Sequence, residues 1–407
     1  MKKLSFPLSW QILTAGALAL VFGVVFPEAA NITGYLGTYY IKIMLLILLP
    51  TIAAHIISGI TQITHLQTLG RIGIKNVVWA LFTQLIAMVS ALIMVNIIIP
   101  GNGIDFEYTT QIDVEKTVNF GDFIPRTFSP NIFRAISENN LCAVTLFCTV
   151  FGCFITKSKD KTRIFLTNFF NSISEVMTRI TDFVARLAPI GVFGALTKLT
   201  ATTDFNATVS KLWVLILTIT AALLIHTFIS LPLFVKITAR CKPYRLMKSV
   251  GSVLFTSFGI SSETLTMPMA INKLNKEIGI SAHTANISMP FQSLTNSNGT
   301  AIFLCVATVF IAQAYGIYIS VTEQIILTFA ILFISFGIPD MPLKYTMLIL
   351  PVLSFLELPV EGAGLVAGCE ILFGNICPFV NMWGDICCTA TIARSEGDTL
   401  NIERQKL

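Results

Sequence analysis

The sequence is short of charged residues, and this shortage excludes most soluble folds. Asp, Glu, Lys and Arg make up 12% of the 407 residues, whereas hydrophobic residues make up 54%. A soluble domain has about 25% charged residues. No hydrophilic block of the sequence is long enough to fold as a separate domain. Most of the chain must therefore face lipid or a buried interior, and the polar segments read as loops.

The sequence also lacks the patterns of metal sites, disulfide frameworks and hydrolytic enzymes. Its four histidines are scattered, and its nine cysteines form no CxxC pair. Most of these cysteines lie in apolar segments, where a free cysteine behaves as a small hydrophobe. The chain contains no HExxH or GxSxG motif. These absences argue against an enzyme, and we expect no cofactor.

What the sequence does contain is a series of apolar runs that are almost free of charge. Most approach the roughly 20 residues that span a bilayer, and the shorter ones fit broken helices or hairpins. We therefore predict an all-α polytopic membrane protein. The runs are Trp10–Phe26, Ile41–Ile57, Val77–Ile99, Val214–Val235, Ala301–Ala314 and Ile325–Phe336.

The basic residues are grouped in alternate connecting segments. Between the groups, the expected loop Glu28–Tyr40 has no Lys or Arg, and Asn102–Asp122 is mainly acidic. Such alternation is the positive-inside pattern. It predicts cytoplasmic N- and C-termini, and it argues that the net charge of +5 does not indicate a nucleic-acid partner. The basic groups are Lys2 and Lys3, Arg71 and Lys75, residues 157–163, and residues 236–248.

Two apolar segments in the second half are broken in a way that predicts re-entrant hairpins. Gly251–Pro268 carries many Ser, Thr and Gly residues, and Ile325–Pro359 has a Gly/Pro break at residues 335–342. Irregular backbone cannot face lipid, so each segment must be buried in protein. The tip of the first hairpin is expected at Ser261 and Ser262. Paired broken segments are typical of a transporter's substrate site, although Gly and Pro are also common in ordinary membrane helices.

Over nearly the whole chain, short motifs resemble the dicarboxylate/amino acid:cation symporters, the family of bacterial glutamate and aspartate transporters. Their order and spacing agree with that family. Where the family has NMDGT, this chain has NSNGT at residues 296–300. The other motifs are LGRIG at 69–73, SPNIFRA at 129–135, APIGVF at 188–193, SSET at 261–264, FIAQAYG at 310–316, NMWGD at 381–385 and ARSEG at 393–397.

This resemblance implies about eight transmembrane helices, two re-entrant hairpins and a homotrimer in the bacterial plasma membrane. It implies uptake of a small dicarboxylate or amino acid, coupled to inward movement of sodium or protons. A transport domain would slide through the membrane against a scaffold, with the outer hairpin as a gate. The implied division is scaffold at 1–76 and 101–211, transport domain at 77–100 and 212–395, and a cytoplasmic tail at 396–407.

Asp385 is the acidic residue deep in the last apolar segment. An ionised carboxylate there is costly unless it is paired or ion-bound, and sodium prefers oxygen ligands. Asn381 lies one helical turn before Asp385, on the same face. By resemblance, Asp385 and the backbone oxygens of Asn296 and Asn381 form a sodium site. The alternative is a carboxylate at the helix end that pairs with Arg394.

A second cation site of the family uses the Asp of NMDGT together with hydroxyls of the third span. Here that Asp is replaced by Asn298, and the hydroxyl pair by Thr83 followed by Gln84. An amide keeps an acceptor oxygen but loses the charge, so the ion stoichiometry is expected to differ from that of the family.

The substrate positions depart further from the family. Relatives that bind acidic amino acids carry an Asp for the amine and an Arg for the side-chain carboxylate, and these positions are Gly374 and Cys377 here. We therefore expect glutamate or aspartate to be held differently, with Asp340 either replacing a missing charge or simply exposed. Backbone N–H groups at the hairpin tips remain to receive a carboxylate. The substrate-binding residues predicted by resemblance are Ser261, Ser262, Thr300, Gly337, Ile338, Pro339, Gly374, Cys377 and Asn381.

Two other classes of membrane protein remain as alternatives. A channel would need a continuous polar pore, whereas these polar breaks are expected to converge in the middle of the membrane. The altered site also leaves open an uncoupled or degenerate transporter that acts as a leak or sensor for a neutral amino acid or carboxylate.

Overall fold

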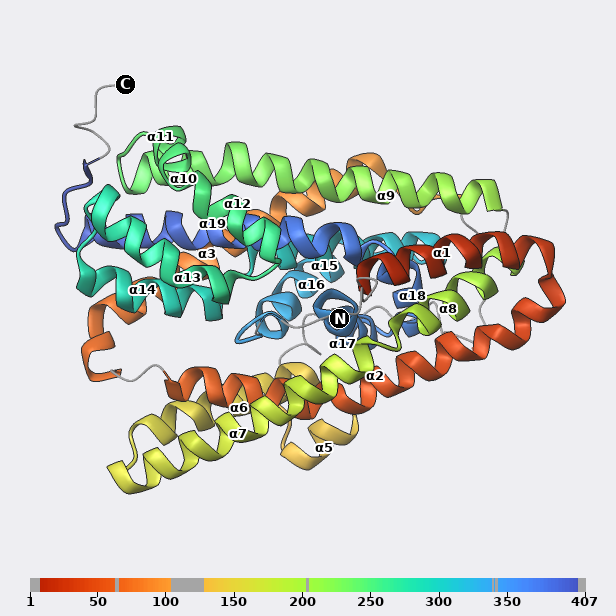
Figure 1. The fold of residues 1–407 in the computed structure, drawn as a ribbon, viewed down its shortest axis with the longest axis horizontal. Helices are drawn as coiled ribbons and strands as arrows, with labels where there is room; N and C mark the ends of the chain where they lie inside the picture. The colour runs from red at the N-terminus through yellow and green to blue at the C-terminus, as the bar shows by residue number, and fades with distance from the viewer. Residues whose placement is uncertain are drawn as a thin grey trace, which may run out of the picture.

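The computed structural model describes residues 8–62, 66–103, 128–202, 205–338, 340 and 343–401. Their regular structure is helical, and no strand occurs among these residues. The helices run mainly along the long axis of the molecule (Figure 1). The predicted all-α class is therefore confirmed.

The chain begins with three long helices, α1 (Leu8–Val25), α2 (Pro27–Gln62) and α3 (Leu66–Ile98). The predicted loop at Glu28–Tyr40 is wrong, because these residues form the first part of α2. Its polar residues are helical because this part of α2 packs against a later helix, α8, at close range. Pro27 stands at the first position of α2, where its missing N–H has no helical partner in any case.

The next helices of the chain pack against α1 and α2. Asn131 accepts hydrogen bonds at the start of α5, and Asn140 does the same for α6. The path of α7 bends by 48° where it meets α8. α2 contacts α6, α7 and α8, and α1 contacts α8. The bounds are α5 Ile132–Ser137, α6 Leu141–Thr156, α7 Asp160–Ala185 and α8 Ala188–Thr202.

The rest of the chain contains the two helical hairpins. α12 and α13 form the first hairpin, whose turn at Ser261–Ser262 is where the sequence predicted it. α16 and α17 form the second hairpin. The bounds are α9 Phe205–Ile225, the π-helix η1 His226–Ser230, α10 Leu231–Thr238, α11 Pro243–Ser249, α12 Gly251–Ile260, α13 Glu263–Lys273, the π-helix η2 Leu274–Ile278, α16 Val321–Ile334 and α17 Lys344–Phe355.

Two broken helices complete this part of the chain. The first consists of α14 and α15, and the second of α18 and α19. α3 packs against α9, α14 and α15, and α19 packs against α12, α14 and α15. The bounds are α14 Ala282–Thr295, α15 Asn298–Ala314, the 3-10 helix η3 Val360–Gly362, α18 Ala363–Ala367 and α19 Glu370–Ser395.

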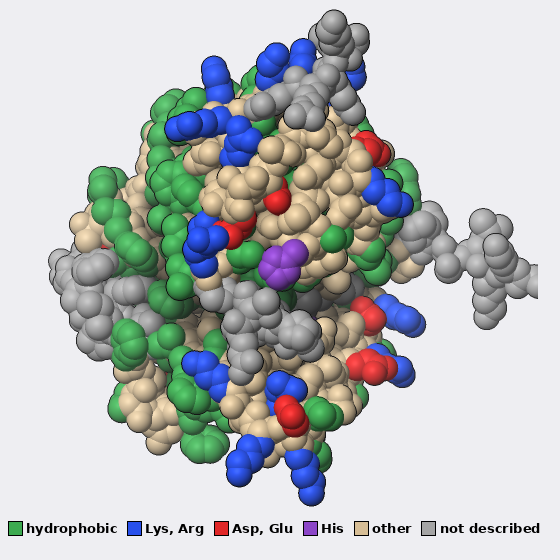
Figure 2. Space-filling view, turned by 90° about the vertical axis from the view of Figure 1, so that its left-hand side faces the viewer, with side chains coloured by type: hydrophobic (Ala, Val, Ile, Leu, Met, Phe, Trp, Pro, Cys, Tyr) green, Lys and Arg blue, Asp and Glu red, His purple; other side chains and the backbone are tan. Residues whose placement is uncertain are grey.

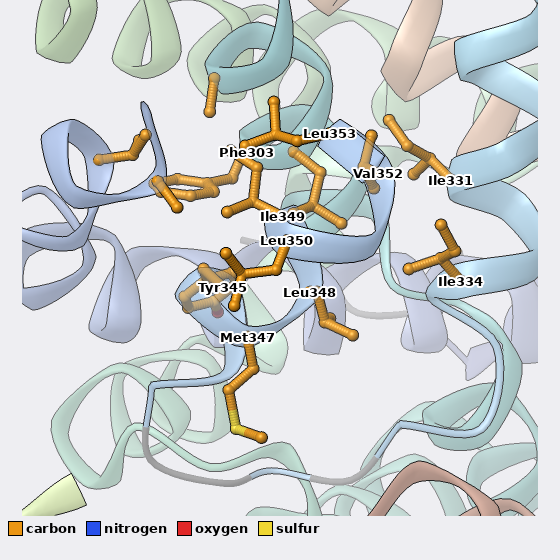
Figure 3. Packing of buried hydrophobic residues seen from close by; sticks show 14 of the residues in the cluster. Phe303, Ile331, Ile334, Tyr345, Met347, Leu348, Ile349, Leu350, Val352 and Leu353 are labelled. Atoms are coloured by element: carbon orange, nitrogen blue, oxygen red, sulfur yellow. The ribbon is translucent and has the colours of Figure 1, made fainter. Parts of the chain in front are cut away.

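The second hairpin is buried on several sides. Figure 3 shows side chains of α17 from Tyr345 to Leu353 packed against Phe303 of α15 and against Ile331 and Ile334 of α16. These residues belong to one large apolar cluster, and a second apolar cluster joins α10–α14 to α19. Burial inside protein is what a re-entrant hairpin requires.

Five helical segments of the described residues are long and apolar enough to cross a membrane, and the bent pair α7–α8 brings the number to six. The shorter apolar helices include Trp10–Val25 and Leu141–Thr156. The predicted total of about eight spans therefore stays a prediction. The five segments are Pro27–Gln62, Arg71–Ile98, Ser210–Thr238, Ala282–Ala314 and Leu372–Ser395.

Candidate functional site

The site centres on the break between α14 and α15. α14 ends at Thr295 and α15 begins at Asn298, so only Asn296 and Ser297 are non-helical. The predicted five-residue break at Asn296–Thr300 is therefore too long, because its last three residues form the first turn of α15. The break is fully enclosed between α3 and α19, and the backbone of Asn296 is extended.

Asp385 faces this break from α19. Asn296 donates from Nδ2 to Asp385 Oδ1 at 3.0 Å, and Thr83 of α3 donates from Oγ1 to Asn296 Oδ1 at 3.1 Å. These three residues are at most 1% exposed. Arg394 is nine residues further along α19, a rise of about 13 Å, and no ion pair joins it to Asp385 in the described chain. The alternative pairing is therefore not observed.

Buried oxygens without a partner lie at the same break. Asp385 Oδ2 has no hydrogen-bond partner, and neither does Oδ1 or Nδ2 of Asn298. A buried polar atom without a partner costs about 1–3 kcal/mol. Carboxylate and amide oxygens at broken helix ends are the ligands that a hard cation prefers. The arrangement therefore fits a cation site.

Gly384 allows α19 to approach the break. A Cβ atom at this position would lie 2.4 Å from Asn298 Nδ2 and 2.9 Å from Asn296 Nδ2. Gln84, in contrast, points away from the break and donates to Ser335 Oγ at the end of α16 at 2.7 Å. Of the predicted Thr83–Gln84 pair, only Thr83 contacts the break.

Asn381 joins three elements of the site. Its Oδ1 accepts from the backbone N–H of Gly299 at 2.6 Å, and its Nδ2 donates to Glu263 Oε1 at 2.5 Å and to Thr300 Oγ1 at 3.4 Å. Cys377, one turn earlier, donates from Sγ to the carbonyl of Gly299 at 3.4 Å. The structure therefore brings together Asn381, Thr300 and Cys377, and their role in binding substrate stays a prediction.

The tip of the first hairpin turns at Ser261, whose φ of +57° is in the left-handed region. The Ser261 hydroxyl donates to Asn375 Oδ1 of α19. Ser262 caps the N-terminus of α13, and its Oγ accepts from the backbone N–H of Leu265 at 3.2 Å. Behind the tip, Ser257 donates to the carbonyl of Pro378 at 3.0 Å. The tip is therefore held against the last helix.

Carboxylates of the protein occupy the N-termini of the second arms of both hairpins. Asp340 Oδ2 accepts from the backbone N–H groups of Glu263 and Thr264, at 2.8 and 3.0 Å. Glu370 accepts from the backbone N–H groups of Tyr345 and Thr346, both at 3.0 Å. Helix N-termini favour negative charge, which explains both contacts.

Lys344 lies beside one of these carboxylates, that of Asp340, and sequence reasoning missed it. It is 5% exposed and is the one buried Lys or Arg within the described part of the chain. Its Nζ is 3.8 Å from Asp340 Oδ1. A single basic residue in an otherwise apolar arm was the available signal, since an ionisable group inside a membrane is costly and functional by default. The same signal applied to Glu263 and Glu370, which are also buried.

The remaining predicted substrate residues belong to the second hairpin and to α19. Gly337 donates from its backbone N–H to the carbonyl of Leu294 at 2.7 Å, and Ile338 is buried. Gly374 has open space beside it, because a Cβ there would meet no atom within 4 Å. Pro339 lies outside the described residues.

A cavity of about 640 Å³ reaches the hairpin tips. It lies between α2 and α7 on one side and α13 and α14 on the other. Polar side chains line both sides, including Ser58 and Thr178 on one and Asn286 and Ser293 on the other. Thr264 and Asp340 also face this cavity, so the tip contact is accessible from it.

A buried carboxylate and unpaired amide at a helix break, beside two helical hairpins in a polytopic membrane protein, define the class of secondary transporters. The chain belongs to the sodium:dicarboxylate symporter family, which it matches over residues 8–395. It is 25% identical to the C4-dicarboxylate transport protein of Bacillus subtilis (strain 168), over 96% of this chain and 94% of that protein. It is also 25% identical to the proton/glutamate-aspartate symporter of Escherichia coli (strain K12), over 97% and 94%, and to the proton/sodium-glutamate symport protein of Bacillus caldotenax, over 96% and 94%.

Proposed function

We propose that this protein is a secondary symporter that couples inward movement of sodium or protons to uptake of a small dicarboxylate or acidic amino acid. Membership of the family supports symport, and the names of the relatives support the substrate class. The observation that carries the proposal is the enclosed break at Asn296–Ser297, where Asp385 Oδ2 and the Asn298 amide have no protein partner.

The cation is proposed to bind at this break. Asp385 supplies the charge, and the backbone oxygens of Asn296 and Asn381 and the Asn298 amide supply further oxygens. Thr83 positions the Asn296 side chain through its hydrogen bond. Because Asn298 is neutral and Gln84 is bonded to Ser335, we propose that fewer cations are coupled here than at a site with a second carboxylate.

The substrate is proposed to bind between the hairpin tips and α19. Ser261, Ser262, Thr300 and Asn381 offer hydroxyl and amide groups, and the N-terminus of α13 offers backbone N–H groups. Gly374 and Cys377 supply no charge, whereas relatives that bind acidic amino acids have an Asp and an Arg at these positions. The substrate is therefore proposed to be held by other groups. The open space beside Gly374 supports this proposal of an altered site.

The protein is further proposed to act as a homotrimer in the bacterial plasma membrane, with cytoplasmic termini and an elevator-type movement. Lys and Arg side chains surround one end of the molecule (Figure 2), where α11 and the start of α7 lie in Figure 1. The positive-inside rule supports the proposal that this end faces the cytoplasm.

Uptake by proteoliposomes under an imposed sodium or proton gradient tests the coupling. Asp385→Asn removes the charge but keeps the shape, and we expect it to abolish gradient-driven uptake of succinate and L-aspartate while the oligomer stays intact. Asp398→Asn is the matched control, because Asp398 accepts from the backbone N–H of Ser281 outside the site. Unchanged cation dependence in Asp385→Asn would contradict the assignment. Wild-type counterflow that ignores the gradient would instead indicate the uncoupled leak.

A further inference from the structure

Three donors at the start of α13 converge on one oxygen of Asp340. They are Ser262 Oγ at 2.9 Å and the backbone N–H groups of Glu263 and Thr264 at 2.8 and 3.0 Å. Under the proposed function, these same N–H groups would receive a carboxylate of the substrate. A carboxylate of the protein already occupies that position.

A buried cation accompanies this contact. The side chain of Lys344 is 7% exposed, and its Nζ lies 3.8 Å from the second oxygen of Asp340. Asp340 in turn accepts from the N–H of Glu263, whose side chain accepts from Asn381 of α19, one turn after Cys377. A positive charge is therefore present close to the position where Cys377 lacks one, and it comes from the second hairpin instead of α19.

We propose that Asp340 is an internal substitute for a substrate carboxylate. A dicarboxylate or acidic amino acid binds by displacing Asp340 from the N-terminus of α13, and its carboxylate then takes over the three donors and lies beside Lys344. This inference rests on the proposed function, since it assigns the anion-binding groups of that site.

The environment of Asp340 fits a contact that can be exchanged, whereas that of Glu370 does not. The Asp340 side chain is 18% exposed and lines the 640 Å³ cavity together with Thr264. Glu370 also caps a helix and accepts from one hydroxyl and two backbone N–H groups, as Asp340 does, but it is buried and does not line this cavity. Once displaced, Asp340 can enter the cavity, where polar side chains and solvent receive it.

A tethered carboxylate competes with every anionic ligand for the same donors. Removing it is expected to tighten binding, because one charge-assisted hydrogen-bonded contact corresponds to roughly tenfold to a hundredfold in affinity. The opposite role, in which Asp340 holds the amine of an amino acid, predicts that its removal weakens L-aspartate and leaves succinate unchanged.

Sodium-dependent binding of succinate and L-aspartate to purified, full-length protein separates these roles. We expect Asp340→Ala to tighten both ligands by roughly tenfold or more, Asp340→Asn to tighten both to a smaller extent, and Lys344→Gln to weaken both by a similar factor. Asp398→Ala is the control, since it removes a carboxylate that accepts a backbone N–H at the start of another helix, and it should leave both affinities unchanged.

Hydrogen exchange without ligand tests the contact itself. The amides of residues 262–266 should exchange faster in Asp340→Ala than in wild type, and Asp398→Ala should not alter them. Unchanged exchange, unchanged affinities, or a loss confined to L-aspartate would overturn the proposal while wild-type binding upholds the proposed function. A wild type that binds neither ligand, with or without sodium, would overturn the proposed function and this assignment with it.

Discussion

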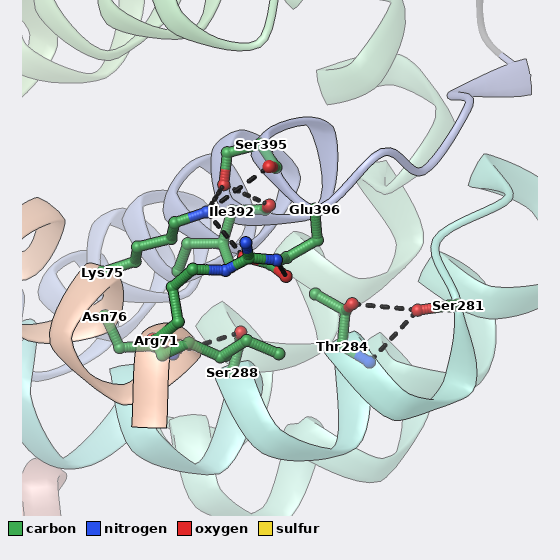
Figure 4. Close-up of polar contacts among 10 residues, drawn as sticks. Arg71, Lys75, Asn76, Ser281, Thr284, Ser288, Ile392, Ser395 and Glu396 are labelled. Atoms are coloured by element: carbon green, nitrogen blue, oxygen red, sulfur yellow. Dashed lines mark hydrogen bonds and ion pairs between the residues drawn. The ribbon is translucent and has the colours of Figure 1, made fainter. Parts of the chain in front are cut away.

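At the scale of single residues, Glu396 holds together the ends of two helices at the basic end of the molecule. Arg71 donates from Nε at 3.2 Å and from Nη2 at 2.5 Å, and Lys75 donates to the same carboxylate at 2.5 Å (Figure 4). Lys75 also donates to Ser395 Oγ at 2.8 Å. The start of α3 is thereby fixed to the end of α19, the helix that carries Asp385.

This contact predicts a dependence of stability on pH. The hydrogen bonds from Arg71, and then those from Lys75, lower the pKa of Glu396 below its ordinary value of 4.5. A carboxylate whose pKa is lowered in the folded state stabilises the protein at pH values above its ordinary pKa. This contribution to stability is lost as the pH falls through the lowered pKa. We expect Glu396→Gln to lower the midpoint of thermal unfolding in detergent at neutral pH, and the gap to wild type to close as pH falls from the ordinary value of 4.5 through the lowered pKa.

The control for this measurement is Glu138→Gln. Glu138 pairs with Arg134 four residues earlier on α5, and both side chains are more than half exposed. Exposed pairs of this kind contribute little, so no shift of the midpoint is expected. A gap between Glu396→Gln and wild type that stays constant across the pH range would contradict the linkage to Glu396 ionisation.

The sequence identified some site residues and missed others for physical reasons. Asp385 could be found because a carboxylate in an apolar helix is costly without a partner. Whether Asp340 was buried or exposed could not be decided, because its contacts come from a hairpin about 80 residues away in sequence. Lys344 was missed because the charged positions of the family lie on α19, whereas Lys344 belongs to the second hairpin and its pairing with Asp340 depends on tertiary structure.

At the scale of elements, α2 and α8 approach each other through glycines. A Cβ on Gly37 would lie 2.6 Å from the backbone N of Ala195, and a Cβ on Gly194 would lie 2.5 Å from the backbone N of Gly37. Small residues allow backbones of membrane helices to pack closely. This close packing is why Glu28–Tyr40 is helical, although its sequence reads as a loop.

Gly37→Ala is therefore expected to weaken the packing of α2 on α8. The added methyl group would meet backbone atoms, which cannot rotate away, and overpacking of this kind costs about 1–3 kcal/mol. The measurement is the free energy of unfolding in mixed micelles. Gly16→Ala in α1 is the control, because its Cβ would meet only Leu196 Cδ1 at an ordinary 3.5 Å. Equal effects of the two variants would show that helix propensity, and not the close contact, decides the result.

Elements with a strong local signal were predicted well from the sequence. The turn of the first hairpin at Ser261–Ser262 and the two arms of the second hairpin follow from Gly, Pro and Ser in apolar runs. The break at Asn296–Ser297 was predicted too long, because Asn298 and Gly299 favour turns in isolation. Asn381 accepts from the N–H of Gly299 and so supports the first turn of α15, and this contact is not visible in the sequence.

At the scale of the whole molecule, the helices form two groups of contacts with a cavity between them. In the first group, α1, α2, α6, α7 and α8 pack on one another. In the second group, α3, α9, α14, α15 and α19 pack on one another. The 640 Å³ cavity separates α2 and α7 of the first group from α14 of the second group and from α13, which packs against α14. The division into a scaffold and a transport domain stays a prediction, and so does their relative movement.

A cross-link between the two groups tests this movement. A Cβ on Gly59 of α2 would lie 3.9 Å from Leu294 Cγ of α14, so a Gly59→Cys/Leu294→Cys pair lies within reach of a short reversible thiol cross-linker. If the second group slides past the first, cross-linking should abolish uptake by the proteoliposomes, leave sodium-dependent ligand binding in place, and be reversed by reduction.

The control is Ile60→Cys/Gly152→Cys, where a Cβ on Gly152 would lie 3.1 Å from Ile60 Cβ and both helices belong to the first group. Because this pair does not bridge the two groups, its cross-linking should leave uptake unchanged. Uptake that continues at the wild-type rate in the cross-linked Gly59–Leu294 protein would show that transport needs no sliding at this interface.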